Sequence, residues 1–330
     1  CGISIRSVSS HVMIRGVTVC SSGYNMTENY GHPSGIYHLS VFNCVIVDCE
    51  FQELEVAIEA FDVERMNVTS NSFESCHRGV AWSGIHSSNS IRDSTIESNT
   101  FRDCDGSVEV LSVRNLTVMG NVFEGQHVAV YLQDAAEASL SENTIRGSTI
   151  CAAWIEGGSN YSIRGNTVES SNSSGVRLHQ VGHTIVANNT VESQQVSLLV
   201  DECIDVVVEH NLLTDCSMGP SLNCGLEVID SAEIVVRFNS VENNQLGVVL
   251  VASDPASMDV VVYNNNFRAN AVNAIDNCGS ENQWDNGYPG GGNFWGVAVV
   301  DEDGDGIGDE EYLIDSDSVD HYPMVNPLTV

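Results

Sequence analysis

The sequence predicts an all-β fold, a parallel β-helix in which each coil of short strands stacks on the coil before it. Asparagine followed two residues later by an apolar residue recurs nine times at intervals of 22 to 28 residues. Between these positions lie short runs of alternating apolar and polar residues, such as 206–210, and no stretch reads as a long amphipathic helix. A period of this length indicates units that bury their apolar face only by stacking.

The recurring asparagines predict a sharp turn between two strands of every coil. Asparagine tolerates the left-handed backbone region and hydrogen-bonds locally better than other non-glycine residues. Stacked coils would place these amides about 4.8 Å apart, as a ladder that satisfies itself from coil to coil. The ladder residues are Asn71, Asn99, Asn121, Asn143, Asn166, Asn189, Asn211, Asn239 and Asn265.

The strands between the asparagines predict about eleven coils over residues 1–277, with a small C-terminal cap over residues 278–330. Loops inserted at 21–33 and 217–223 are expected on one side of the coils. The sequence pattern changes after Cys278, and this tail is not expected to form another coil. Solenoid ends need a cover for their unpaired strand edge, and the tail supplies aromatic residues for one, including Trp295 and Tyr312.

The charge of the chain excludes several partners. Its formal net charge is -33, and its 12 basic residues are all arginine. Such a surface repels nucleic acid and anionic membranes, and it suits high salt or the gathering of divalent cations. No run of 18 apolar residues is present, so no transmembrane segment is expected. Because residues 1–5 already read as a strand, we expect the numbered chain to begin inside a longer precursor.

The 11 cysteines favour an oxidising compartment. Cys76 and Cys104 each lie five residues after a ladder asparagine, so they fall at equivalent sites of consecutive coils, close enough for a disulfide. Pairing among the other local candidates stays open. Because the number of cysteines is odd, at least one thiol stays free or bonds to another chain. These further candidates are Cys44, Cys49, Cys203, Cys216 and Cys224.

Six Asn-x-Ser/Thr sequons favour the same location, because this motif is the acceptor for N-glycosylation in exported proteins. We therefore expect an extracellular or cell-surface glycoprotein. The candidate asparagines are Asn25, Asn67, Asn115, Asn160, Asn172 and Asn188.

An acidic loop near the C-terminus predicts a calcium site. Carboxylates at positions 1, 3, 5 and 9 of the loop, a glycine at position 6 and a backbone carbonyl at position 7 follow the order in which calcium loops wrap a hard cation. Tyr312 stands where such loops have a glutamate, and Glu310, Glu311 and Asp315 are the candidates to complete the shell. The predicted ligands are Asp301, Asp303, Asp305, the carbonyl of Ile307, and Asp309.

Three tail motifs give the chain a specific resemblance. Gly292-Asn-Phe-Trp295, the acidic loop at 301–309, and Asp320-His-Tyr-Pro-Met324 follow in the order seen at the C-termini of NosD-like right-handed β-helix proteins. This resemblance implies a right-handed helix, the usual hand of parallel crossovers, and export. The family takes its name from copper-site maturation, but the ten histidines and seven methionines show no clustered soft-ligand spacing, so copper is disfavoured.

For function, abundant stabilising features and the lack of a sharp catalytic motif favour a structural or adhesive envelope protein of a sheath, surface layer or filament. Its partners would be further copies or other envelope proteins. The alternative is a polysaccharide lyase, hydrolase or epimerase, or a glycan-binding module, that uses one strand face. A slip of one residue in the alignment would turn half of that face inward. Its candidate catalytic residues are Glu109, Glu156, Arg177, His179, Asp201 and Glu202, with Tyr131 and Trp154 to stack on sugars.

Overall fold

The structure is a computed structural model, and it describes residues 3–6, 11–20, 34–39, 41–84, 91–216, 223–253, 258–278 and 282–329. These residues form β-strands and connecting turns, with no helix among them. The chain divides into two compact units, residues 1–162 (unit 1) and 163–330 (unit 2). Within each unit the strands form three parallel sheets, A, B and C, so the predicted right-handed parallel β-helix is confirmed.

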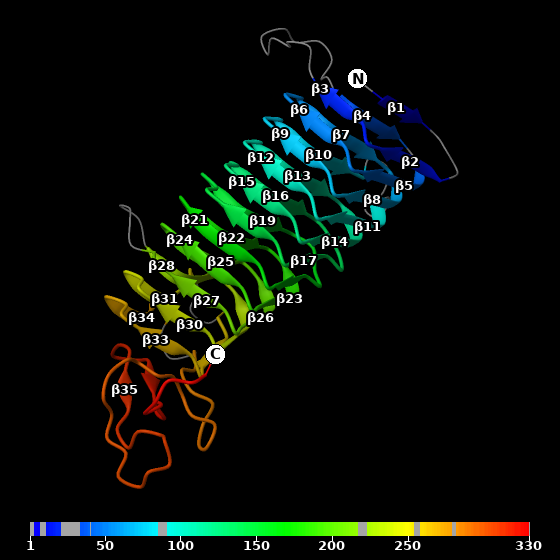
Figure 1. The fold of residues 1–330 in the computed structure, drawn as a ribbon. Helices are drawn as coiled ribbons and strands as arrows, with labels where there is room; N and C mark the ends of the chain where they lie inside the picture. Colours follow the sequence, from blue (N-terminus) through cyan, green and yellow to red (C-terminus); the bar gives the residue numbers. More distant parts are fainter. Residues whose placement is uncertain are drawn as a thin grey trace. The chain divides into compact units, whose positions relative to one another are not determined.

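In unit 1 each coil adds one strand to each sheet, and successive strands of a sheet lie side by side (Figure 1). Sheet A contains β1 (Ile3–Arg6), β4 (Ser34–Leu39), β7 (Val56–Phe61), β10 (Arg78–Ser83), β13 (Gly106–Leu111), β16 (Val128–Gln133) and β19 (Cys151–Glu156). Sheet B contains β2 (Val12–Arg15), β5 (Phe42–Val47), β8 (Glu64–Thr69), β11 (Ile91–Glu97), β14 (Val113–Met119) and β17 (Ser139–Ser141). Sheet C contains β3 (Thr18–Cys20), β6 (Glu50–Gln52), β9 (Ser72–Glu74), β12 (Thr100–Arg102), β15 (Val122–Glu124) and β18 (Thr144–Arg146).

Unit 2 repeats the arrangement, and β20 (Ser162–Arg164) lies at the boundary of the units. Sheet A contains β22 (Ser174–His179), β25 (Val196–Asp201), β28 (Cys224–Ile229), β31 (Leu246–Val251) and β34 (Val272–Asp276). Sheet B contains β23 (Gly182–Ala187), β26 (Ile204–Glu209), β29 (Ala232–Arg237) and β32 (Val260–Tyr263). Sheet C contains β21 (Thr167–Ser171), β24 (Thr190–Ser193), β27 (Leu212–Thr214), β30 (Ser240–Glu242) and β33 (Asn266–Arg268). A two-stranded antiparallel pair follows, β35 (Tyr312–Leu313) and β36 (Val319–Asp320).

Alternation along each strand separates an apolar interior from a polar exterior. In β13, Val108 and Val110 are buried, whereas Glu109 between them faces outward and is half-buried. The register stacks apolar residues of successive coils on one another, since Val108 lies opposite Val130 of the next coil. Phenylalanines of sheet C stack inside unit 1 with ring centroids 4.4 to 5.0 Å apart, from Phe51 to Phe123. Across the described residues the sheets hold 12, 11 and 11 strands, in agreement with about eleven coils.

The predicted asparagine ladder is present. The Nδ2 of Asn71 donates to the Oδ1 of Asn99 at 3.0 Å, and the backbone N–H of Asn71 donates to the same oxygen at 2.9 Å. Asn99 repeats both bonds toward Asn121, and its Nδ2 also donates to the carbonyl of Val68 at 2.9 Å. In unit 2 the same pattern runs from Asn166 to Asn293.

The physical reason expected for the ladder was wrong in one respect. The ladder asparagines do not adopt the left-handed conformation; the residue before each of them does, as in Ser98 with φ of 55° and His210 with φ of 54°. The asparagine is buried instead, at 1% exposure for Asn99, because its amide closes the backbone hydrogen bonds of the turn. The preceding residue makes the bend.

The tail also departs from expectation, because it continues the coil before it leaves the sheets. Gln283 bridges Val261 of β32, and Phe294 bridges Asn266 of β33, both in parallel. Asn293 adds a rung to the ladder, since its Oδ1 accepts from Asn265 at 3.0 Å. Trp295 stacks on Phe267 at 4.6 Å. The division of the chain at residues 277 and 278 stays a prediction.

Two buried aspartates hold this last partial coil in place. Asp320 accepts hydrogen bonds from the Asn293 N–H at 2.7 Å and from the Trp295 Nε1–H at 2.8 Å. Asp276 accepts from the indole of Trp284 at 3.0 Å and from the Ser318 hydroxyl at 3.0 Å. Burial raises the pKa of Asp320 from 3.8 to about 6, and the hydrogen bonds that it accepts oppose this rise only in part.

We predict that replacing one ladder asparagine destabilises unit 1. Asn99→Ala removes the oxygen that accepts two buried donors of Asn71, and each unpaired donor costs about 1–3 kcal/mol. Urea unfolding of Asn99→Ala should therefore shift to markedly lower denaturant. The exposed Asn67→Ala, on a neighbouring strand, is the matched control and should unfold as the wild type does. Equal unfolding of the two variants would contradict a stabilising ladder.

We predict that Asp320 makes the fold more stable as the pH falls from 7.5 to 4.5. Its folded pKa lies above its unfolded value, so the folded state binds the proton more tightly. The contribution is about 2–3 kcal/mol, at ~1.4 kcal/mol per pKa unit. Thermal unfolding of the wild type and of Asp320→Asn, followed across this pH range in a calcium chelator, checks it. The difference in stability between the two should change with pH, and a constant difference would refute the assignment.

Candidate functional site

A charged cluster lies on the outer face of sheet A in unit 2, and we call it the unit 2 cluster: Arg177, His179, Asp201 and Glu227. Arg177 and His179 come from β22, Asp201 from β25 and Glu227 from β28. The parallel register sets His179 opposite Asp201, with Leu199 between Arg177 and Glu227. The Nδ1 of His179 lies 3.0 Å from the Asp201 Oδ2, and a guanidinium nitrogen of Arg177 lies 3.6 Å from the same oxygen.

The electrostatics of this cluster differ from residue to residue. Burial raises the pKa of Glu227, and the negative charge of Asp201 raises it further. The Asp201 carboxylate lies within ion-pair distance of both the Arg177 guanidinium and the His179 imidazole. A carboxyl group with a raised pKa near a second carboxylate and a histidine is an arrangement that can donate and accept protons.

Sequence reasoning brought three members of the cluster together and missed the fourth. Glu227 lies 28 residues after Leu199, in the coil that follows the insertion at 217–223, and it was not among the predicted face residues. The signal was present in the alternation of β28, because Glu227 stands between the apolar residues Leu226 and Val228 and only Glu227 of the three is not buried. Glu202 does not join the cluster; it sits in the turn after β25, where its carboxylate accepts from Gln180 at 2.7 Å.

The other predicted face residues gather on sheet A of unit 1. The Tyr131 hydroxyl donates to the Glu156 Oε2 at 2.8 Å, and its ring meets Trp154 edge to face at 5.5 Å. Burial, together with the Glu156 carboxylate, raises the pKa of Tyr131 to about 12. Glu109 lies opposite Tyr131 and is 3.5 Å from the Arg78 guanidinium. The rings of Tyr131 and Trp154 therefore form an edge-to-face pair on the outer face of sheet A.

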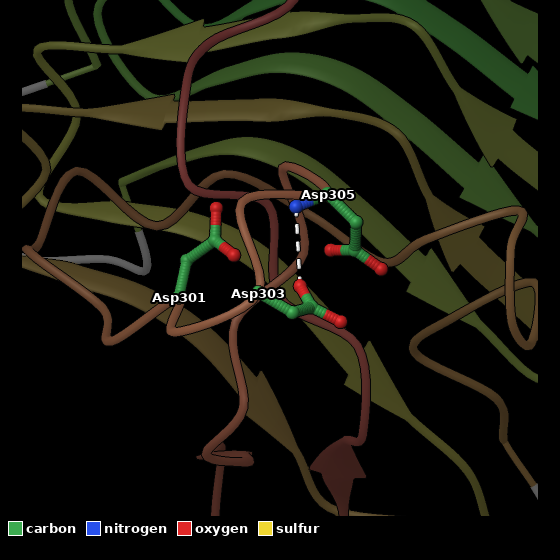
Figure 2. Close-up of side chains that lie close together, drawn as sticks. All are labelled: Asp301, Asp303 and Asp305. Atoms are coloured by element: carbon green, nitrogen blue, oxygen red, sulfur yellow. Dashed lines mark hydrogen bonds between the residues drawn. The ribbon is translucent and has the colours of Figure 1, made fainter.

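The acidic loop folds around its own backbone. Asp301 accepts from the N–H groups of Gly304 at 2.7 Å and Gly306 at 3.1 Å, and Asp303 accepts from Asp305 at 3.1 Å. Figure 2 shows these three carboxylates converging from one loop, and ligand oxygens of the three lie within 4.8 Å of one another. Glycines at 304 and 306 have φ of 77° and 91°, where other residues are strained. Three carboxylates at this spacing fit a hard divalent cation.

The remaining candidate ligands are engaged to different degrees. Asp309 accepts from the Glu302 N–H at 2.6 Å, which closes the loop. Glu311 lies 2.6 Å from the His321 imidazole, and Asp315 caps its own turn by accepting from Ser318 at 2.9 Å. Ile307 bridges Met324, and Gly308 donates to the Pro323 carbonyl at 2.7 Å, so the loop is tied to the segment that carries Asp320.

The structure shows no disulfide between cysteines of the described residues. Cys76 and Cys104 do lie in adjacent coils, and their side chains hydrogen-bond each other. Cys216 contacts the Ser197 hydroxyl at 3.1 Å, and burial raises its pKa to about 11. Burial likewise raises the pKa of Cys44 to about 12 and of Cys203 to about 11, and it raises that of Cys224. Cys49 occupies the ladder position of its coil, where its N–H donates to Asn71. Disulfide formation stays a prediction.

Five of the six sequon asparagines lie within the described residues, and each of them is exposed: Asn67, Asn115, Asn160, Asn172 and Asn188. Asn25 lies outside the described residues. Exposure makes the five accessible to a modifying enzyme, and glycosylation stays a prediction.

Comparison with known families supports the resemblance. A model described as right handed beta helix region matches residues 106–267, and a model described as periplasmic copper-binding protein (NosD) matches residues 11–171. The chain is a NosD-like right-handed β-helix protein. No curated protein matches this NosD-like chain by sequence.

Solved structures show the same fold at low identity. A double mutant of the periplasmic alginate epimerase AlgG is 13% identical to the NosD-like chain, with a TM-score of 0.60, over 76% of this chain and 69% of the epimerase. The tailspike protein of E. coli bacteriophage HK620 in complex with a pentasaccharide is 13% identical, with a TM-score of 0.62, over 84% of this chain and 58% of the tailspike. At these identities the likeness is one of fold.

The residues do not fit the copper named in the family description. Within the described part of the NosD-like chain, the group of three potential ligands whose atoms converge consists of Asp301, Asp303 and Asp305. Carboxylate oxygens select hard cations, whereas copper takes thiolate, thioether and imidazole ligands.

The described residues contain no helix that could span a membrane.

Proposed function

We propose that this chain is an exported protein that acts on a polysaccharide by acid–base chemistry at the unit 2 cluster. The observation that carries the proposal is Glu227, a half-buried carboxyl group whose pKa is raised by burial and by the nearby Asp201. Both similar solved structures are named for glycans, an alginate epimerase and a tailspike with a pentasaccharide, and this supports the substrate class.

The roles follow from the geometry. The protonated Glu227 would donate its proton to an oxygen of the sugar. His179, whose Nδ1 faces Asp201, keeps its Nε2 to accept a proton, while Asp201 orients the ring and stabilises the imidazolium that forms. Arg177 would stabilise negative charge on the substrate. A net charge of -33 disfavours polyanions, so we expect a neutral or weakly charged polysaccharide.

We predict that Glu227→Gln abolishes most turnover, with a loss in kcat of about 10²-fold or more. A panel of neutral and acidic polysaccharides, incubated with the protein and followed by NMR and by chain length, would identify the substrate. His179→Ala should lose activity to a similar degree. Glu233→Gln, at an exposed position of β29 in unit 2, is the matched control and should keep it.

The outcome that contradicts the proposal also favours the second candidate. If no polysaccharide is altered and electron microscopy of the native material shows ordered assemblies, the protein is a structural or adhesive envelope component. That candidate is favoured by the ladder, the internal aromatic stack and the tail that holds the last partial coil, because these are features of a durable scaffold. Its partners would be further copies or other envelope proteins.

We further propose that the loop at 301–309 binds calcium through Asp301, Asp303, Asp305, the Ile307 carbonyl and Asp309. The three converging carboxylates support this, and so does their order along the loop. The ion would offset the repulsion among the carboxylates. Since the loop is hydrogen-bonded to the segment that carries Asp320, its occupation would stabilise the tail.

We predict that millimolar calcium raises the thermal unfolding midpoint, because a ligand that binds only the folded state stabilises it. Asp303→Asn, which removes one converging carboxylate, should lose most of this increase. Glu302→Gln, an exposed neighbour in the same loop whose side chain is not a predicted ligand, should retain it. An increase that survives in Asp303→Asn would show that calcium acts elsewhere.

A further inference from the structure

A groove in unit 2 lies at the corner where sheet B turns into sheet C, and none of its lining residues belongs to the unit 2 cluster on sheet A. Its cavity volume is about 410 Å³, enough for a saccharide of one or two rings. Its walls come from the turns before β24 and β27 and from the outer faces of β24, β27 and β30. We call it the turn groove, and its lining includes Asn188, Thr190, His210, Leu212, Ser240 and Glu242.

The turn position beside the groove carries unusual residues. In other coils the left-handed residue before the ladder asparagine is small or polar, as in Ser70, Ser98 and Gly120. Here it is His210, followed one coil later by Phe238, each with a positive φ. Histidine is among the residues enriched in this backbone region, whereas the bulky ring of Phe238 is strained there, and such strain commonly marks a functional site.

Both rings are held in a fixed orientation. His210 stacks on Phe238 with centroids 5.2 Å apart and planes 10° apart, and Phe238 meets Tyr263 at 6.2 Å. The Arg237 guanidinium lies 5.9 Å from the Phe238 centroid and donates to the Glu209 carboxylate at 2.8 Å and to the Tyr263 hydroxyl at 3.2 Å. The imidazole at the groove is therefore backed by an aromatic ring and is exposed to solvent.

The other walls offer hydrogen bonds. Asn188 and Thr190 are exposed, Ser240 is half-buried, and Glu242 adds a carboxylate. The ladder amides of Asn189 and Asn211 form the floor, and their hydrogen bonds to the next rungs keep it rigid. A flat ring, an apolar contact and several fixed polar groups are the features that recognise a sugar, with its apolar ring face and its equatorial hydroxyls.

We propose that the turn groove binds a neutral saccharide unit, with its apolar face on His210 and its hydroxyls on Glu242 and Asn188. The charge near the groove decides between neutral and acidic sugars. Glu209 is neutralised by Arg237, whereas Glu242 contributes a negative charge that accepts hydroxyl hydrogen bonds strongly and repels a uronate. The groove would hold the glycan without reacting with it, and this inference does not require the unit 2 cluster to be catalytic.

Binding of tetrasaccharides tests the proposal. The probes are cellotetraose, maltotetraose and chitotetraose, with a mannuronate tetramer as the acidic comparison, and calorimetry with saturation-transfer NMR measures their dissociation constants. Because Asn188 is also a sequon residue, mass spectrometry first confirms that this residue is unmodified in the protein used. We expect at least one neutral probe to bind and the acidic probe to bind much more weakly.

Matched variants locate the site. His210→Asn keeps a residue that suits the left-handed turn and removes the ring, and it should weaken binding about fivefold to tenfold. Glu242→Gln should weaken it by a similar factor. The controls are His183→Asn, an exposed histidine of β23 that also has a positive φ, and Glu192→Gln, a carboxylate two coils away in the same row; both should bind as the wild type does.

Three results would overturn the inference. The first is failure of all neutral probes to bind at about 10 mM. The second is binding that is unchanged in both groove variants when thermal unfolding shows them to be folded. The third is a preference for the mannuronate tetramer. Loss of turnover in Glu227→Gln would leave this binding intact, so the groove and the unit 2 cluster succeed or fail separately.

Discussion

The buried asparagine amide is the interaction on which each coil depends. A turn in a parallel solenoid leaves backbone carbonyl and N–H groups inside the wall, away from water, and each must be paired. The Oδ1 of Asn99 accepts two donors from the preceding rung, while its Nδ2 serves a carbonyl and the next amide. One side chain therefore closes the hydrogen bonds of two coils, and the residue before it is left to make the bend.

With the interior so tightly specified, variation is confined to the outward positions. Sheet A illustrates this, because its inward residues repeat valine, leucine and isoleucine while its outward row reads Arg177, Leu199 and Glu227 in unit 2. Adjacent strands of a sheet place these outward side chains next to one another, so residues from different coils, far apart in sequence, form one site. The unit 2 cluster and the turn groove are both built in this way, one on a strand face and the other on a turn.

The sequence predicted the fold through periodicity, since the spacing of ladder asparagines and the alternation of apolar residues report burial directly. It also placed His179 and Asp201 on or near one strand face, and the structure sets the two opposite each other. Sequence reasoning missed Glu227, in a coil of changed length. It also gave the wrong reason for the ladder asparagine, because this residue type can either adopt the left-handed conformation or pair buried backbone groups. The turn groove was not predictable, because its walls combine two turns and three strands whose side chains look unremarkable one by one.

Asn293 carries a consequence for assembly. Its oxygen takes the last rung of the ladder, but its own N–H is bound by Asp320 rather than by another amide. Its Nδ2 is likewise occupied, by the carbonyls of Val262 and Trp284. A second molecule approaching this edge would find the hydrogen bonds of the ladder closed. The ladder would therefore not propagate from one molecule to the next at this end.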